Sequence, residues 1–277
     1  MSSPAPWSPT DETLPVPGGA ALAVRRWPGA LPLRSGAWIL HLHGGAFVGG
    51  SLDSGAPVAQ LLAETAGLVV SLDYPLAPAN PFPRAAEAAH AALLALDRQR
   101  RRVAPGAPLL VAGEEAGGNI AAAAALMARD RAGPVLAGQI LLSPMLDVCI
   151  GTASQRDARD GPLGCRCADG WRAYLPKAGD AVHPYATPAD SVRLSGLPPA
   201  LLVTANDDPQ RDETLAFDRR LRAAGVPSRA VVLPMRTGWP CSLALPEPGA
   251  WATPLRETLR HFITTTPASH PLQRENT

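Results

Sequence analysis

Short apolar runs alternate along the chain with longer segments in which apolar residues recur at helical spacing. The run over residues 38–43 ends at two glycines, and a continuous apolar stretch of this length predicts a strand that is buried on both faces. Similar runs predict strands over residues 67–72, 108–112, 138–142, 200–204 and 230–233. Helical spacing and good helix formers predict helices over residues 84–101, 120–131, 214–224 and 254–264.

Strands that alternate with helices in this way predict an α/β fold with a mostly parallel sheet and helices on both faces. The segment 148–195 interrupts the alternation, because it is irregular and rich in glycine, aspartate, arginine and proline. We interpret it as a small cap over the site. The whole chain, 1–277, is then a single domain, and the polar segment 267–277 is expected to be a disordered tail.

Composition narrows the class of partner. Apolar residues make up 46% of the chain and the net charge is +1, so neither a nucleic acid nor an anionic membrane surface is expected. No apolar run is long enough to span a bilayer and the first residues show no signal pattern, which favours the cytoplasm. The four cysteines lack the spacing of a metal site, so we expect free thiols, no metal and no cofactor.

Four motifs follow predicted strands in a fixed order. They are HGGAF at 43–47, DYPLAP at 73–78, GEEAGGN at 113–119 and DPQRDE at 208–213. In this order they resemble the oxyanion loop, a second landmark, the nucleophile turn and the acid segment of the hormone-sensitive-lipase-like esterases. The resemblance covers about residues 36–240 and implies the α/β-hydrolase fold.

The resemblance also implies an oxyanion hole, in which backbone N–H groups face a developing negative charge. Gly44, Gly45 and the amide of Ala116 are the predicted donors, because they lie in the glycine loop and at the start of the helix. Their retention favours a site that binds a carbonyl or carboxylate oxygen. The simpler alternative is that the glycines persist only because a tight turn needs them.

The chain departs from the family at two positions that carry the chemistry. Glu115 stands where the nucleophile turn has its serine, and Thr237 stands where the family's histidine precedes a glycine and an aromatic residue. The acid is retained as Asp208, with Asp207 beside it as an alternative. Without serine and imidazole, an acyl-enzyme route through an activated hydroxyl is closed.

These departures lead to the hypothesis of a non-hydrolytic enzyme of specialised metabolism, an isomerase, epimerase, dehydratase or cyclase. Glu115 would be its acid or base beside the retained oxyanion hole, and Asp208 a second acid or base. The small-molecule substrate is expected to contact four further side chains, His43, Asn119, Thr237 and Trp239.

Two alternatives stay open at this point. One is an inactive relative of the esterases that binds a small molecule without turnover. The other is a residual or atypical ester hydrolase. The resemblance further implies a homodimer as a candidate assembly, because edge-strand dimers are frequent in the family.

Overall fold

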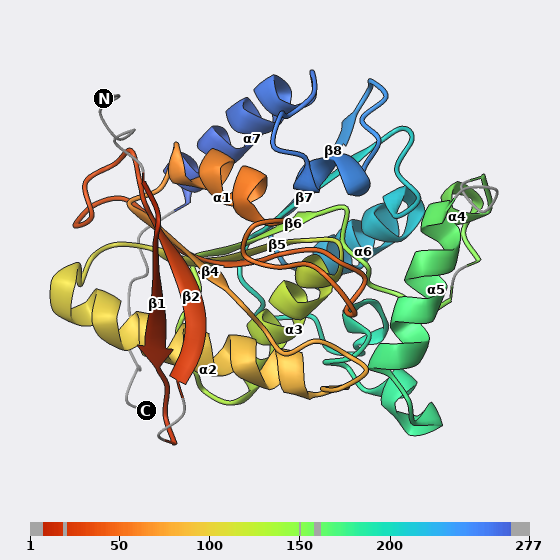
Figure 1. The fold of residues 1–277 in the computed structure, drawn as a ribbon, viewed down its shortest axis with the longest axis horizontal. Coiled ribbons are helices and arrows are strands. Elements are labelled where there is room, and N and C mark those ends of the chain that lie inside the picture. Colours follow the sequence, from red (N-terminus) through yellow and green to blue (C-terminus); the bar gives the residue numbers. More distant parts are fainter. Residues whose placement is uncertain (1–7, 19–20, 150, 158–161, 267–277) are drawn as a thin grey trace.

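The computed structural model describes residues 8–18, 21–149, 151–157 and 162–266, and an eight-stranded sheet forms its centre (Figure 1). The strand order is β1-β2-β4-β3-β5-β6-β7-β8. The strands β3 to β8 run parallel to their neighbours, and β2 pairs antiparallel with both β1 and β4. The strands are β1 Thr10–Pro15, β2 Ala21–Pro28, β3 Trp38–Leu42, β4 Leu68–Leu72, β5 Leu109–Glu114, β6 Gly138–Leu142, β7 Ala200–Ala205 and β8 Ser228–Leu233.

Helices cover both faces of the sheet, with α1 and α7 on one side and α2, α3 and α6 on the other (Figure 1). Successive strand residues therefore point into two separate cores: Leu40 and Val111 face α2 and α3, whereas Ile39 and Leu110 face α1 and α7. The α-helices are α1 Ala56–Ala63, α2 Arg84–Val103, α3 Ala116–Asp130, α4 Ala153–Asp157, α5 Pro162–Tyr174, α6 Arg211–Ala223 and α7 Ala252–Thr265.

The predicted α/β-hydrolase architecture is confirmed, and the six predicted strands correspond to β3–β8. The sequence reading missed the N-terminal hairpin of β1 and β2. Strand β1 lies at the edge of the sheet and buries only Leu14 of its six residues, so it has no continuous apolar run. Helix α1 was missed as well, because it is only eight residues long. Helix α3 begins at Ala116 rather than at residue 120.

The segment 148–195, predicted as a cap, contains α4, α5 and two short 3-10 helices, Ala178–Val182 and Pro188–Asp190. Residues 150 and 158–161 of this segment, and the predicted tail 267–277, lie outside the described residues. Helix α5 packs against the loop that follows β3, where Phe47 stacks on Tyr174 with ring centroids 4.1 Å apart and meets Trp171 at 4.8 Å. This contact places α5 beside the predicted oxyanion loop.

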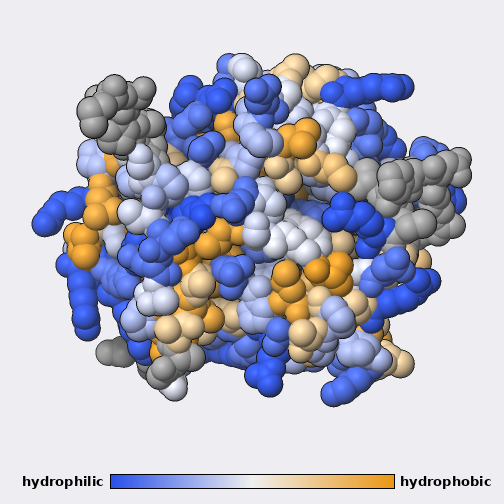
Figure 2. Space-filling view, viewed as in Figure 1, coloured by the Kyte–Doolittle hydropathy of each residue, from blue (hydrophilic) through white to orange (hydrophobic). Residues whose placement is uncertain are grey.

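The molecular surface is mixed in character. In Figure 2, apolar and polar side chains are interspersed over the face seen in Figure 1, so that polar groups break up the apolar ones. Among the described residues, no helix combines the length and the apolar character that a membrane span requires.

Helix α5 approaches the oxyanion loop so closely that only glycine fits at residue 170. A Cβ atom there would lie 2.2 Å from the carbonyl oxygen of Ala46. We expect Gly170→Ala to lower the free energy of unfolding by ~1–3 kcal/mol, because backbone atoms have to move apart. The matched control is Gly106→Ala, whose Cβ meets nothing within 4 Å and should change stability by less than ~0.5 kcal/mol. Urea denaturation measures both, and equal effects would contradict the close packing.

Candidate functional site

A single residue, Glu115, forms the turn between the last residue of β5 and the first residue of α3. Its backbone has φ 54° and ψ −118°, a left-handed conformation that non-glycine residues seldom adopt. The turn packs directly on the loop after β3: a Cβ on Gly117 would lie 2.1 Å from the carbonyl oxygen of Leu42. This is the tight strand-to-helix turn that the glycine-rich motif predicts.

The Glu115 side chain reaches the glycine loop that follows β3. Its Oε2 atom accepts hydrogen bonds from the backbone amides of Gly45 and Ala46, the latter at 3.1 Å. Burial raises the pKa of Glu115, and the two amide hydrogen bonds together with the positive charge of Arg166 oppose that rise. A carboxylate therefore fills the place where an oxyanion is expected to bind.

Of the three predicted oxyanion donors, the amide of Gly45 binds the Glu115 carboxylate, and the amide of Ala46 binds the same oxygen. The amide of Gly44 turns the other way and donates to Oε1 of Glu114 at 3.3 Å. The third predicted donor, Ala116, opens α3 directly after Glu115, and its role stays a prediction.

An open pocket of about 170 Å³ lies in front of Glu115. Gly44, Gly45, Glu114 and Glu115 line one side of it. The other side comprises Arg166 of α5 and the segment from Pro240 to Ala244, which includes the Cys241 thiol and the 3-10 helix Cys241–Ala244. Burial raises the pKa of Cys241, so its thiol stays protonated.

Sequence reasoning missed Arg166, Cys241 and Glu114 as residues of the pocket. Arg166 lies in α5, in a stretch whose sequence has no clear apolar period, and Cys241 lies in a short 3-10 helix, so no periodic pattern marks either. Glu114 is adjacent to Glu115 in the sequence, and a pair of acidic residues directly before a glycine turn was an available signal. Among the described residues, no group of three or more histidine, cysteine, aspartate and glutamate side chains could hold a metal ion.

Asp207, not Asp208, contacts the loop that contains Thr237. The Asp207 carboxylate accepts hydrogen bonds from the Thr237 amide at 2.9 Å, the Thr237 hydroxyl at 2.9 Å and the Gly238 amide at 2.9 Å. Burial alone would raise the pKa of Asp207, but these donors hold it below its ordinary value. The alternative that the sequence left open is therefore the residue that holds the Thr237 loop.

Asp208, the predicted second acid or base, points away from that loop and does not line the Glu115 pocket. It is 1% exposed and accepts hydrogen bonds from the hydroxyls of Ser143 at 2.8 Å and Thr204 at 2.6 Å, and from the Gln210 amide at 2.9 Å. Burial raises the pKa of Asp208 to about 6. The structure thus does not bring Asp208 and Glu115 together in one pocket, because Glu115 lines one pocket and Asp208 lines another together with Asp207.

The four predicted substrate contacts are all buried away from the pocket. His43 stacks on Tyr74 with ring centroids 4.3 Å apart, and its Nδ1 atom lies 2.8 Å from the carbonyl oxygen of Gly44. Asn119 is fully buried and donates to the carbonyl oxygen of Ala186 at 3.1 Å. Thr237 is 7% exposed, and Trp239 is 1% exposed in the core against Trp251. None of the four side chains lines the pocket in front of Glu115, and their contact with a substrate stays a prediction.

Comparison with known proteins identifies relatives of this arrangement. Residues 39–237 match a family described as the alpha/beta hydrolase fold. The chain is 37% identical over 196 residues to the carboxylesterase NlhH of Mycobacterium tuberculosis. This match covers 68% of this chain and 61% of that protein. It is 32% identical over 242 residues to an ethyl acetate hydrolase of Pseudomonas putida, which covers 81% of this chain and 73% of that protein.

The same likeness holds in three dimensions. The structure of a thermostable esterase from Pseudomonas putida ECU1011 matches with a TM-score of 0.85 at 26% identity, over 97% of this chain and 86% of that one. The match to NlhH spans less than two thirds of that protein's length.

These relatives overturn one prediction. The non-hydrolytic reaction predicted from the sequence, an isomerase, epimerase, dehydratase or cyclase, is wrong. The curated relatives are named as ester hydrolases at 32–37% identity, and the solved structure is an esterase. The residue types at two motif positions are weaker evidence about the reaction than a likeness that extends over most of the chain.

The elevated pKa of Asp208 makes a prediction about stability. Its pKa is about 6 in the folded protein against an ordinary 3.8, so the fold favours the protonated carboxyl. The stabilisation is complete below the ordinary pKa and is lost as the pH rises through about 6. We expect the free energy of unfolding of the wild type, relative to Asp208→Asn, to fall by about 2 kcal/mol between about pH 4 and pH 7.

Urea denaturation at several pH values measures this difference. All other titrating groups are common to the two proteins and cancel. A difference that stays constant across this pH range would contradict the assignment of a protonated Asp208 in the fold.

Proposed function

Because this chain belongs to the α/β-hydrolase fold family, we propose that its pocket hydrolyses small carboxylic esters by an atypical route that depends on Glu115. One observation carries the proposal. The Glu115 carboxylate lies at the strand-to-helix turn and contacts the two backbone amides that would face an ester carbonyl. A group that moves protons and a pair of oxyanion donors therefore share one site.

The proposal includes a degenerate catalytic triad. By their resemblance to the family motifs, Glu115 replaces the serine and Thr237 replaces the histidine. The acid is Asp207, which follows β7 and binds Thr237. No hydroxyl nucleophile with an imidazole base results from this set. We also propose that segment 148–195 is a cap of a single domain, which the contact of α5 with Phe47 supports.

In the proposed reaction a water molecule is the nucleophile. The ester carbonyl oxygen accepts hydrogen bonds from the amides of Gly45 and Ala46 and displaces the Glu115 carboxylate. As the water oxygen attacks the carbonyl carbon, the Glu115 carboxylate accepts a proton from that water. The tetrahedral intermediate then releases the alcohol, which takes that proton from Glu115. Glu115 returns to the carboxylate form and the product is a carboxylic acid.

This route is expected to be slow, since the ester has to displace a carboxylate that already holds two amide hydrogen bonds. Serine hydrolases that lose their nucleophile keep roughly 10³–10⁴-fold acceleration over water from the oxyanion hole and binding alone. We expect the wild type in that range.

The first test is hydrolysis of p-nitrophenyl acetate and butyrate by the wild type and by Glu115→Gln. Glutamine keeps the size of the side chain but cannot accept the proton, so the enzymatic rate should fall by at least ~10²-fold. The wild-type rate should rise with pH through the raised pKa of Glu115, because only the carboxylate is a base.

The control is Glu87→Gln, which removes a surface carboxylate bound to Arg131. It should keep the full rate. A wild type that is no faster than buffer would refute ester hydrolysis, whereas a fully active Glu115→Gln variant would refute only the role of Glu115.

The second test restores the family residues with Glu115→Ser and Thr237→His together. Removal of Glu115 empties the oxyanion hole, and the imidazole introduced at position 237 would lie beside Asp207, so hydrolysis should rise by more than ~10²-fold over the wild type. Each single variant is the control and should show little gain, because serine and its base act as a unit. A folded but silent double variant would show that the pocket does not bind esters in the family's manner.

A further inference from the structure

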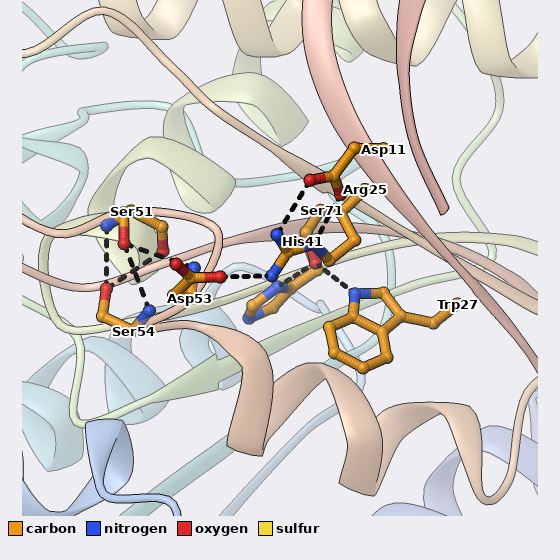
Figure 3. A network of polar contacts seen from close by, with 8 residues as sticks. All are labelled: Asp11, Arg25, Trp27, His41, Ser51, Asp53, Ser54 and Ser71. Carbon is orange, nitrogen blue, oxygen red and sulfur yellow. Dashed lines mark hydrogen bonds and ion pairs between the residues drawn. The ribbon is translucent and has the colours of Figure 1, made fainter. Parts of the chain in front are cut away.

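A chain of buried polar side chains crosses four neighbouring strands, β2, β4, β3 and β5, and ends at the pocket. Trp27 of β2 donates from Nε1 to Oγ of Ser71 at 3.1 Å, and Ser71 lies 2.9 Å from Nδ1 of His41. Figure 3 shows these three side chains in a row. The Nε2 atom of His41 lies 2.8 Å from Oε2 of Glu114. All four residues are at most 3% exposed.

One assignment of hydrogens satisfies every contact of this chain. The indole N–H of Trp27 can only donate, so Ser71 Oγ accepts from it. Ser71 can then donate its own hydrogen to Nδ1 of His41, which leaves the imidazole hydrogen on Nε2 to donate to Glu114. Every polar atom of the three side chains that follow Trp27 has a partner, which buried groups need if they are not to destabilise the fold.

The chain ends on the oxyanion loop. The second oxygen of Glu114 accepts the amide of Gly44, the residue before the two amides that face the hole. Adjacent peptide planes share one Cα atom, so fixing the Gly44 amide limits the direction of the Gly45 amide. Because the Gly44 N–H donates to Glu114, it points away from the hole.

We propose that Glu114, anchored by His41, Ser71 and Trp27, is a positioning residue that aims the Gly45 and Ala46 amides into the oxyanion hole. The proposal rests on the proposed function for its catalytic meaning, because the aimed amides are those that would bind an ester carbonyl. It goes beyond that function by assigning a role to Glu114 and His41, which lie outside the replaced serine and histidine positions.

A purely structural role is the competing explanation, and burial alone does not distinguish the two. A core that needed only packing would be filled by apolar side chains, as are the strand positions Ile39, Val69 and Ala112 on the same face of the sheet. The chain from Trp27 to Glu114 instead consists of polar groups: a tryptophan N–H, a serine hydroxyl, an imidazole and a carboxylate. The series leads to one backbone amide of the site, which a packing role does not require.

The pKa of Glu115 provides a readout that does not depend on hydrolysis. The amides of Gly45 and Ala46 lower this pKa, as does the positive charge of Arg166, whereas the negative charge of Glu114 raises it as a smaller effect. The other titratable groups near Glu115 are Tyr74, Cys167 and Cys241, whose pKa values are raised by burial first and then by other groups including Glu115. Losing the amides and losing the Glu114 charge thus move the pKa of Glu115 in opposite directions.

The experiment compares Glu114→Leu with Glu114→Gln, which both remove the charge. Leucine leaves the Gly44 amide without an acceptor, so the pKa of Glu115 should rise. Glutamine can still accept from Gly44 and donate to His41 after the imidazole hydrogen moves to Nδ1, so the pKa should fall. NMR titration of the Glu115 carboxyl carbon measures both, and hydrogen exchange at the Gly45 and Ala46 amides should accelerate about tenfold in Glu114→Leu only.

Asp218→Asn is the control for the loss of a buried carboxylate, since Asp218 is 2% exposed and binds Ser228 far from the pocket residues. It should leave the Glu115 titration and both amides unchanged. A fall in the pKa of Glu115 in both Glu114 variants, with unchanged amide exchange, would overturn the proposal.

If Glu114→Leu does not fold, Ser71→Ala is the variant that tests the proposal. It removes the hydrogen-bonded link between Trp27 and His41 and leaves the Glu114 charge in place. Faster exchange at Gly45 and Ala46 then supports the proposal, and unchanged exchange overturns it. A wild type without esterase activity would refute the proposed function and leave these readouts intact, so the two failures are distinguishable.

Discussion

The hydrogen bonds from the Gly45 and Ala46 amides to the Glu115 carboxylate are the contact on which the site depends. They join the loop after β3 to the turn after β5, two segments about 70 residues apart in the sequence. A carboxylate bears the same charge as the oxygen of a tetrahedral intermediate, so the loop is held in the geometry that stabilises negative charge. The anion at this site is therefore a side chain of the protein itself, Glu115, and the pocket lies in front of it.

Sheet topology makes this contact predictable in outline. Strands β3 and β5 are parallel neighbours, so the loops at their carboxyl ends lie side by side at one edge of the sheet. The sequence motifs that follow predicted strands therefore identify the two halves of the site and the α/β-hydrolase fold. The buried strands can also be predicted from the sequence, because each is a short run of mainly apolar residues.

What the sequence does not specify is the direction of individual side chains outside regular elements. Asp207 and Asp208 are adjacent and chemically identical, yet one holds the Thr237 loop and the other lies against Ser143 and Thr204. Trp239 follows a glycine in a loop and still enters the core against Trp251. Such directions depend on packing between segments distant in sequence, and Arg166 enters the pocket for the same reason.

The hydrogen bonds of Asp207 have an evolutionary consequence. This carboxylate holds the loop by two backbone amides as well as by the Thr237 hydroxyl, so most of its anchoring does not depend on which side chain occupies position 237. A lineage could therefore exchange an imidazole there for a smaller side chain with little loss of folding free energy. The stability of this loop and the chemistry of the side chain at position 237 are therefore largely independent of each other.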